Sequence, residues 1–125
     1  MSVISVDTKN RRPIYEQLID SIKELVLRGV LKPGEQLPGV RTLAMELAIN
    51  PNTIAKSYAE LERLGIIYSL PGRGSFVADD ITDLELNRRE EVKAQLQKAI
   101  KAAAEAGFDK SELVSFIDNI WREQK

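Results

Sequence analysis

Residues 37–77, LPGVRTLAMELAINPNTIAKSYAELERLGIIYSLPGRGSFV, constrain the fold of this chain more than any other stretch. Apolar residues recur at helical spacing over residues 40–47, which predicts one short helix. Asn50 and Pro51 then favour a new helix start, because asparagine caps helix N-termini and proline suits the first helical position. The pattern predicts a second helix from about Pro51 to Leu64, separated from the first by a tight turn.

A β-hairpin is predicted directly after this helix pair. Gly65 suits a left-handed helix end, and two β-prone runs at 66–69 and 75–78 follow it. The tip between them carries Arg73 between two glycines, which allow close backbone approach and leave the arginine projecting. Two short helices followed by a hairpin form the layout of a winged helix-turn-helix.

Polar and cationic side chains mark the start of the second helix and the hairpin tip as candidates for contact with double-stranded DNA. Short donors and a lysine at the start of a recognition helix reach base edges or phosphates, and a cation on a wing reaches the minor groove. Capping alone explains Asn50, and a solvated surface residue is the plain alternative for each cation. The candidate DNA-binding residues are Arg41, Asn50, Asn52, Thr53, Lys56, Ser57, Gly72, Arg73 and Gly74, of which Asn52, Thr53, Lys56 and Ser57 are expected to face outward.

The order and spacing of these motifs resemble the DNA-binding domain of GntR-type bacterial transcription regulators. The matching pieces, over roughly Pro13 to Ala78, are the leading helix PIYEQLIDSIKELVLRGVL, the loop KPGEQLP, then VR, NPNT and GxGxFV. NPNT followed by Tyr58 and LE, with a short C-terminal part, is similar to the YtrA subgroup. The resemblance implies a bacterial, dimeric transcription regulator, with repression by occluding polymerase as the favoured outcome.

Two departures from the family pattern bear on the helix pair. Gly39 stands where relatives often have serine, which removes a hydroxyl cap. Ala48 stands where many helix-turn-helix units have glycine, so a left-handed backbone there is expected to cost on the order of 1 kcal/mol. The operator preference of relatives that read guanine with an early arginine is not carried over, because Pro51 or Ala55 occupies the matching position.

Beyond Ala78 the sequence predicts two more helices. An apolar stripe runs through residues 92–103 and stops at Gly107, and Asp109 with Glu112 has the spacing of a capping box for a last helix. Two short helices cannot hide both stripes from water, so a second copy of the chain is the simplest cover. The expected dimerisation residues are Val92, Leu96, Ile100, Phe116, Ile120 and Trp121.

The expected fold class is mainly α with a small β-hairpin. Residues 1–78 form a winged helix-turn-helix DNA-binding domain, and residues 79–125 form a C-terminal two-helix dimerisation hairpin. A scaffold helix over about residues 14–28 supports the reading helices, with Tyr15, Leu18, Ile22, Leu25 and Val26 on its apolar face.

Composition excludes some classes of function but does not identify one. The net charge is −1, with 10 Lys and Arg against 8 Asp and Glu up to residue 78, and 8 against 11 beyond it. A local patch of cations serves DNA binding even so, because phosphate attraction acts over roughly 8–10 Å. The chain has no cysteine and no histidine, which removes the usual nucleophiles and neutral-pH bases. We therefore expect no enzyme activity, no cofactor and no metal.

The expected partners are double-stranded DNA on a palindromic site and a second copy of the chain. No run approaches a membrane span and no signal layout is present, so a cytoplasmic location and no membrane partner are expected. A small-molecule effector would have to bind between the C-terminal helices or at the dimer interface, and the absence of any effector pocket is an equally open alternative. A winged-helix protein-interaction adaptor that does not bind DNA is the competing function.

Overall fold

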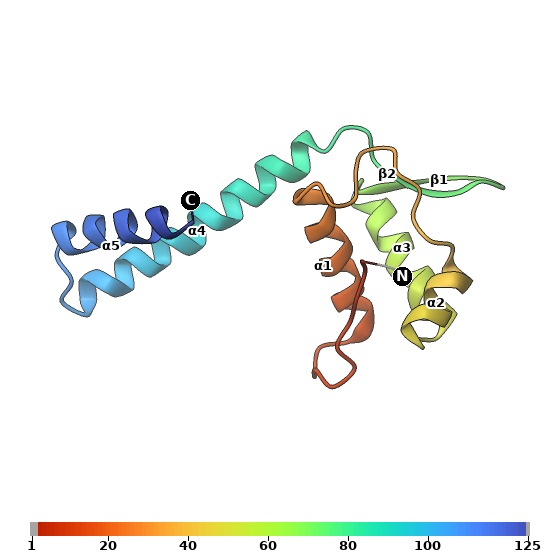
Figure 1. Ribbon diagram of the computed structural model, residues 1–125, viewed down its shortest axis with the longest axis horizontal. Coiled ribbons are helices and arrows are strands. Elements are labelled where there is room, and N and C mark those ends of the chain that lie inside the picture. Colours follow the sequence, from red (N-terminus) through yellow and green to blue (C-terminus); the bar gives the residue numbers. More distant parts are fainter. Residues whose placement is uncertain (1–2, 125) are drawn as a thin grey trace. The chain divides into compact units, whose positions relative to one another are not determined.

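The computed structural model describes residues 3–124. These residues form five helices and one two-stranded antiparallel hairpin, and the chain divides after Glu85 into two compact units (Figure 1). The predicted fold class, mainly α with a small hairpin, is confirmed. The elements are α1 (Ile14–Leu27), α2 (Val40–Leu47), α3 (Pro51–Arg63), β1 (Ile67–Leu70), β2 (Gly74–Val77), α4 (Thr82–Glu105) and α5 (Lys110–Glu123).

The core of the first unit lies between α1 and α3. Leu18, Ile22 and Val26 form the buried stripe of α1, spaced at helical intervals as predicted. Tyr15 and Leu25, which we expected on the same face, are only half-buried. On α3 the buried side chains include Ile54, Tyr58 and Leu61, and Ile4 from the segment before α1 also enters this core. Each fully buried aliphatic side chain of this kind contributes about 1.5–3 kcal/mol.

The turn between α2 and α3 has the left-handed backbone that the sequence predicted. Ala48 has φ 56° and ψ 48°, and no other non-glycine residue in the range 3–124 has a positive φ. The Ile49 N–H donates to the Ala44 carbonyl at 3.0 Å, which closes the end of α2. The fold therefore holds a strained alanine at the point that sets the angle between the two helices.

Replacing Ala48 with glycine is expected to stabilise the protein by about 0.5–1 kcal/mol. Glycine removes the Cβ strain of the left-handed conformation, and the larger freedom of glycine in the unfolded chain offsets part of the gain. Thermal unfolding should show a melting temperature higher by a few degrees. Ala48→Val is the matched opposite change, and a lower melting temperature for Ala48→Gly would contradict the expectation.

The hairpin of β1 and β2 is short and anchored at its base. Ile67 pairs with Val77 and both side chains are buried, whereas Leu70 pairs with Gly74 at the exposed tip. The Tyr68 and Phe76 rings stack on one face with centroids 5.6 Å apart. The loop before α2 pairs with the other edge of β2: Leu37 N–H donates to the Ser75 carbonyl and Val77 N–H donates to the Glu35 carbonyl, each at 2.8 Å.

The second unit contains most of α4 and all of α5. Asp109 and Glu112 form the predicted capping box: the Glu112 N–H donates to Asp109 Oδ1 at 2.9 Å, and the Asp109 N–H donates to Glu112 Oε1 at 3.2 Å. The hydrogen bond from the Glu112 N–H lowers the pKa of Asp109, and a bond from the Ser111 side chain adds a smaller effect. The capping carboxylate is therefore charged at neutral pH. Within residues 3–124, no helix is both long and apolar enough for a bilayer crossing.

Candidate nucleic-acid interface

The start of α3 is open to solvent on the side away from the core. The Asn50 carboxamide oxygen accepts the Asn52 N–H at 2.8 Å and caps the helix, as the sequence predicted. Asn52 and Lys56 are exposed and Thr53 is half-buried. These three side chains therefore line the accessible part of the first turns of α3.

Ser57 does not face outward, and the prediction of an outward side chain is wrong. Ser57 is fully buried, and its hydroxyl lies 3.2 Å from the Tyr15 carbonyl and 3.0 Å from the Thr53 carbonyl. The position one turn after Thr53 falls on the side of α3 that packs against α1. A small residue is needed there because the two helices approach closely, and its hydroxyl back-bonds to α3 while reaching α1.

Lys56 is placed by an aromatic ring of α1. Its Nζ lies 4.2 Å from the centroid of the Tyr15 ring, within the range of a cation–π contact. The half-buried Tyr15 thus presents one face of its ring to a cation of α3 rather than filling the core. Sequence periodicity missed this contact, because it placed Tyr15 on the apolar face of α1.

Tyr58 connects α3 to the segment that enters α2. Its hydroxyl donates to the Pro38 carbonyl at 2.7 Å. Burial, with a smaller effect of the Glu46 charge, raises the pKa of Tyr58, so the phenol stays protonated and able to donate. Pro38 directly precedes Gly39, the N-cap residue of α2, and Arg41 lies exposed in the first turn of that helix. Tyr58 is thus a buried packing residue, and its hydrogen bond adds a link between the two helices.

The wing tip is held by a residue that the sequence did not indicate. Gln36 Nε2 donates to the Arg73 carbonyl at 2.8 Å, and the Arg73 N–H donates to the Leu70 carbonyl at 2.9 Å. The Arg73 side chain is exposed, and its neighbours Gly72 and Gly74 have φ of 76° and 118°. A glutamine in a loop 37 residues earlier carries no local pattern that would link it to the hairpin.

Replacing Gly74 with alanine is expected to destabilise the wing by about 2 kcal/mol. The positive φ is unfavourable for any side chain, and a Cβ there would lie 2.9 Å from Gln36 Nε2, so the amide would move and lose its bond to Arg73. Gly72→Ala is the matched control, since no atom lies within 4 Å of its added Cβ and only a backbone cost of about 1 kcal/mol remains. Equal losses in urea unfolding for the two variants would contradict the role of Gln36.

The candidate residues occupy three separate elements. Arg41 is on α2, the exposed polar residues follow Asn50 on α3, and Arg73 is at the wing tip; within residues 3–124 no hydrogen bond or ion pair joins these three groups. No cluster of three or more His, Cys, Asp or Glu side chains in that range is placed to hold a metal ion. A helix-turn-helix with an exposed second helix and a glycine-tipped wing defines the winged helix-turn-helix class of DNA-binding proteins.

Comparison with known proteins assigns the family. Residues 14–77 match the family described as "Bacterial regulatory proteins, gntR family". The chain belongs to the GntR family, and it is a DNA-binding transcription regulator rather than an enzyme.

Two of the similar proteins align over nearly the whole chain, and a third aligns over little more than half of it. The HTH-type transcriptional repressor YtrA of Bacillus subtilis is 43% identical over 119 residues, which are 94% of this chain and 92% of that protein. A crystal structure of a transcriptional regulator from Oenococcus oeni has a TM-score of 0.80 and 31% identity, over 97% of this chain and 99% of that one. The DBD of AraR in complex with operator ORE1 has a TM-score of 0.52 and 27% identity, over 58% of this chain and 89% of that one. The resemblance to the YtrA subgroup is thereby confirmed.

Proposed function

We propose that this protein is a cytoplasmic transcriptional repressor that binds a palindromic operator as a homodimer. The observation that carries the proposal is the solvent-open start of α3, capped by Asn50 and lined by Asn52, Thr53 and Lys56. The name of the B. subtilis relative YtrA supports repression, and the operator complex of AraR supports DNA as the ligand. An adaptor that does not bind DNA gains no support from these relatives.

In this proposal α3 enters the major groove with its N-terminal turns. Asn52 and Lys56 reach base edges or phosphates, and Arg41 at the start of α2 contacts the backbone of the same half-site. Arg73 at the wing tip follows the neighbouring minor groove, which the small residues on either side of it allow it to approach. Asn50 serves as a cap, and Ser57 supports α3 from the side of α1 without touching DNA.

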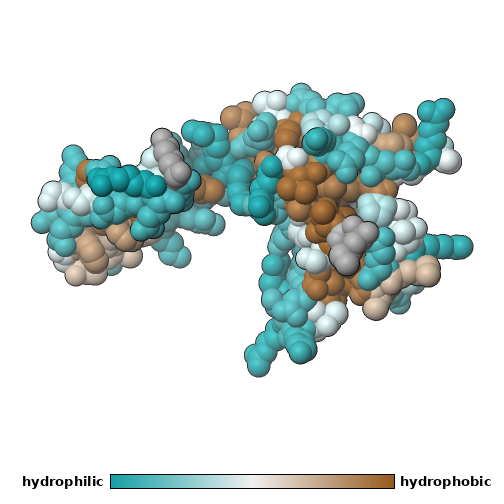
Figure 2. Space-filling view, in the orientation of Figure 1, coloured by the Kyte–Doolittle hydropathy of each residue, from teal (hydrophilic) through white to brown (hydrophobic). Residues whose placement is uncertain are grey.

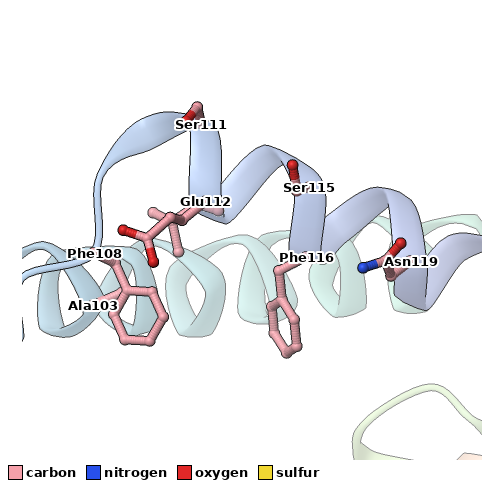
Figure 3. A pocket seen from close by; sticks show the side chains of 8 residues that line it. Ala103, Phe108, Ser111, Glu112, Ser115, Phe116 and Asn119 are labelled. Atoms are coloured by element: carbon pink, nitrogen blue, oxygen red, sulfur yellow. The ribbon is translucent and has the colours of Figure 1, made fainter.

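The dimer is proposed to form through the second unit, residues 86–125, as the main part of the C-terminal segment that begins at residue 79. No residue of α4 or α5 is buried in the single chain. Figure 3 shows Phe108 and Phe116 projecting to the same side of α5, along a groove that Ala103 and Leu113 also line. The proposed dimer contacts are large apolar side chains that are between 37% and 61% exposed: Val92, Leu96, Ile100, Phe116, Ile120 and Trp121.

A small-molecule effector has weak support from this groove. It is open along one side, and four of its eight lining residues are polar: Ser111, Glu112, Ser115 and Asn119. Ligand sites in proteins usually enclose most of the ligand. We therefore assign the groove to a partner helix and name no effector.

The test of the proposed function is selection of bound sequences from a fluorescent duplex pool that contains the DNA upstream of the gene, titrated at several salt concentrations. Enrichment of a palindrome, with affinity falling steeply with salt as expected for roughly four to ten neutralised phosphates, would support a dimeric sequence-specific regulator. Absence of binding even at low salt would count against it. A reporter gene under the recovered site would then distinguish repression from activation.

A further inference from the structure

We propose that the loop before α1, residues 7–12, is a second DNA-contacting surface that binds backbone phosphates of the same duplex through Lys9 and Arg11. The inference rests on the proposed function and extends it, because this loop lies before residue 14, where the match to the family begins. The family model therefore does not include the loop, although the alignment with YtrA covers 94% of this chain. Three observations support the inference: the loop is held in place by hydrogen bonds, two of its cationic side chains are exposed, and it lies close to α3.

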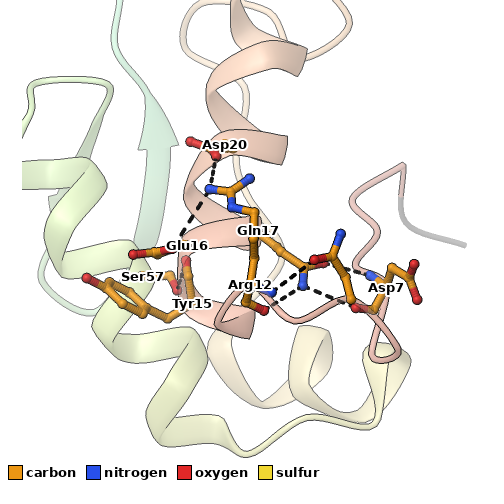
Figure 4. A network of polar contacts seen from close by, with 8 residues as sticks. Asp7, Arg12, Tyr15, Glu16, Gln17, Asp20 and Ser57 are labelled. Atoms are coloured by element: carbon orange, nitrogen blue, oxygen red, sulfur yellow. Dashed lines mark hydrogen bonds and ion pairs between the residues drawn. The ribbon is translucent and has the colours of Figure 1, made fainter.

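The loop is ordered before any ligand binds. Gln17 on α1 clamps both of its ends: the Asp7 N–H donates to Gln17 Oε1 at 2.8 Å, and Gln17 Nε2 donates to the carbonyls of Asp7 and Arg12 at 3.1 and 2.9 Å (Figure 4). Asn10 Oδ1 accepts the Arg12 N–H at 2.9 Å, and Ile4 is buried in the core just before the loop. A preordered loop loses little conformational entropy on binding.

Of the three cations in the loop, one pairs with acidic side chains and the other two remain available to bind phosphate. Arg12 hydrogen-bonds to Asp20, which raises the pKa of the guanidinium, and Glu16 lies 3.9 Å away. Lys9 and Arg11 are exposed, and neither side chain forms an ion pair within the described range 3–124. The carboxylate of Asp7 is turned to the Lys9 backbone N–H, at 2.9 Å. Two long cationic side chains are thus left facing solvent.

The loop leads into the end of α1 that touches α3. Tyr15, in the first turn of α1, carries Lys56 over its ring, and its carbonyl lies 3.2 Å from the Ser57 hydroxyl. The loop is therefore close to the turns of α3 proposed to enter the major groove. In Figure 2 hydrophilic side chains extend from the tip where Figure 1 places the start of α1. Phosphates flanking the half-site fit this position, since cations contact them without reading sequence.

The test compares Lys9→Gln/Arg11→Gln with Arg28→Gln/Lys32→Gln on the operator recovered above. The control removes the same number of charges near the other end of α1, where Arg28 is the C-cap residue. Each lost phosphate contact lowers the salt slope by about 0.9, so a dimer that loses four should lose about 3.6, with affinity down roughly 10³- to 10⁴-fold at 0.1 M salt. Ethylation interference should also lose its signals outside the half-sites in the loop variant only.

The outcomes separate the two proposals. An affinity, salt slope and interference pattern that match those of the control variant would overturn the loop assignment alone. Wild-type protein that binds no duplex would overturn the proposed function and this inference together. Unchanged thermal unfolding, expected because both side chains are exposed, shows that the loop variant is folded.

Discussion

Replacing Arg41 and Arg73 with alanine in the same chain is expected to lower operator affinity at least 100-fold. The two arginines lie on different elements, α2 and the wing, and both are exposed. A phosphate contact contributes roughly 1 kcal/mol at 0.1 M salt, and separated contacts add approximately, so the proposed dimer, which loses four contacts, should lose about 4 kcal/mol. Fluorescence anisotropy with the recovered operator measures the loss.

The controls test whether the loss is local. Exposed substitutions of this kind change stability by about 0.5 kcal/mol or less, so thermal unfolding and the dimer mass should stay as in the wild type. Arg28→Ala removes a charge at the C-terminal end of α1 and should affect affinity much less. Unchanged affinity in the double variant would show that the DNA-contacting residues are assigned wrongly.

Replacing Phe116 and Ile120 with glutamate is expected to give a monomer of 14.0 kDa with little change in helix content. The two residues lie four apart on α5, hence on one face, and are 61% and 37% exposed in the single chain. Charges there would have to be buried without partners in the dimer, which is strongly unfavourable. Operator affinity should fall by about 10²–10⁴, the usual gain from linking two binding modules.

Sedimentation analysis and operator titration measure the two effects of this substitution. Asp118→Ala/Arg122→Ala is the matched control, since these residues also lie four apart on α5 and are charged rather than apolar. The control should remain dimeric. If the glutamate variant is still a dimer, the dimer interface lies on another surface of the protein.

Features set by local sequence could be predicted well. The capping box at Asp109, the cap at Asn50 and the left-handed turn at Ala48 depend on a few neighbouring residues, and all three are present. Most ends of the helices and strands lie within about one residue of the predicted ends. For example, β1 begins at Ile67 rather than Ile66. Short-range hydrogen bonding and steric limits suffice to define such features.

The predictions that were wrong concern side chains whose positions depend on contacts between elements distant in the sequence. Ser57 was expected outside because serine is polar, but the side of α3 that meets α1 is wider than its apolar stripe, and a small residue lets the helices approach. Periodicity places Tyr15 on the apolar face of α1, whereas its ring faces Lys56. Neither contact follows from the periodicity of a single helix, because each depends on where a second helix lies.

The bond from Gln36 to the Arg73 carbonyl couples the wing to a loop that has no proposed DNA-contacting residue of its own. The orientation of Arg73 therefore depends on residue 36 as well as on the glycines beside it. During divergence, a substitution of Gln36 would change the orientation of the wing while every DNA-facing side chain stayed the same. Regulators with identical contact residues can in this way acquire different operators through a position that no alignment of those residues would reveal.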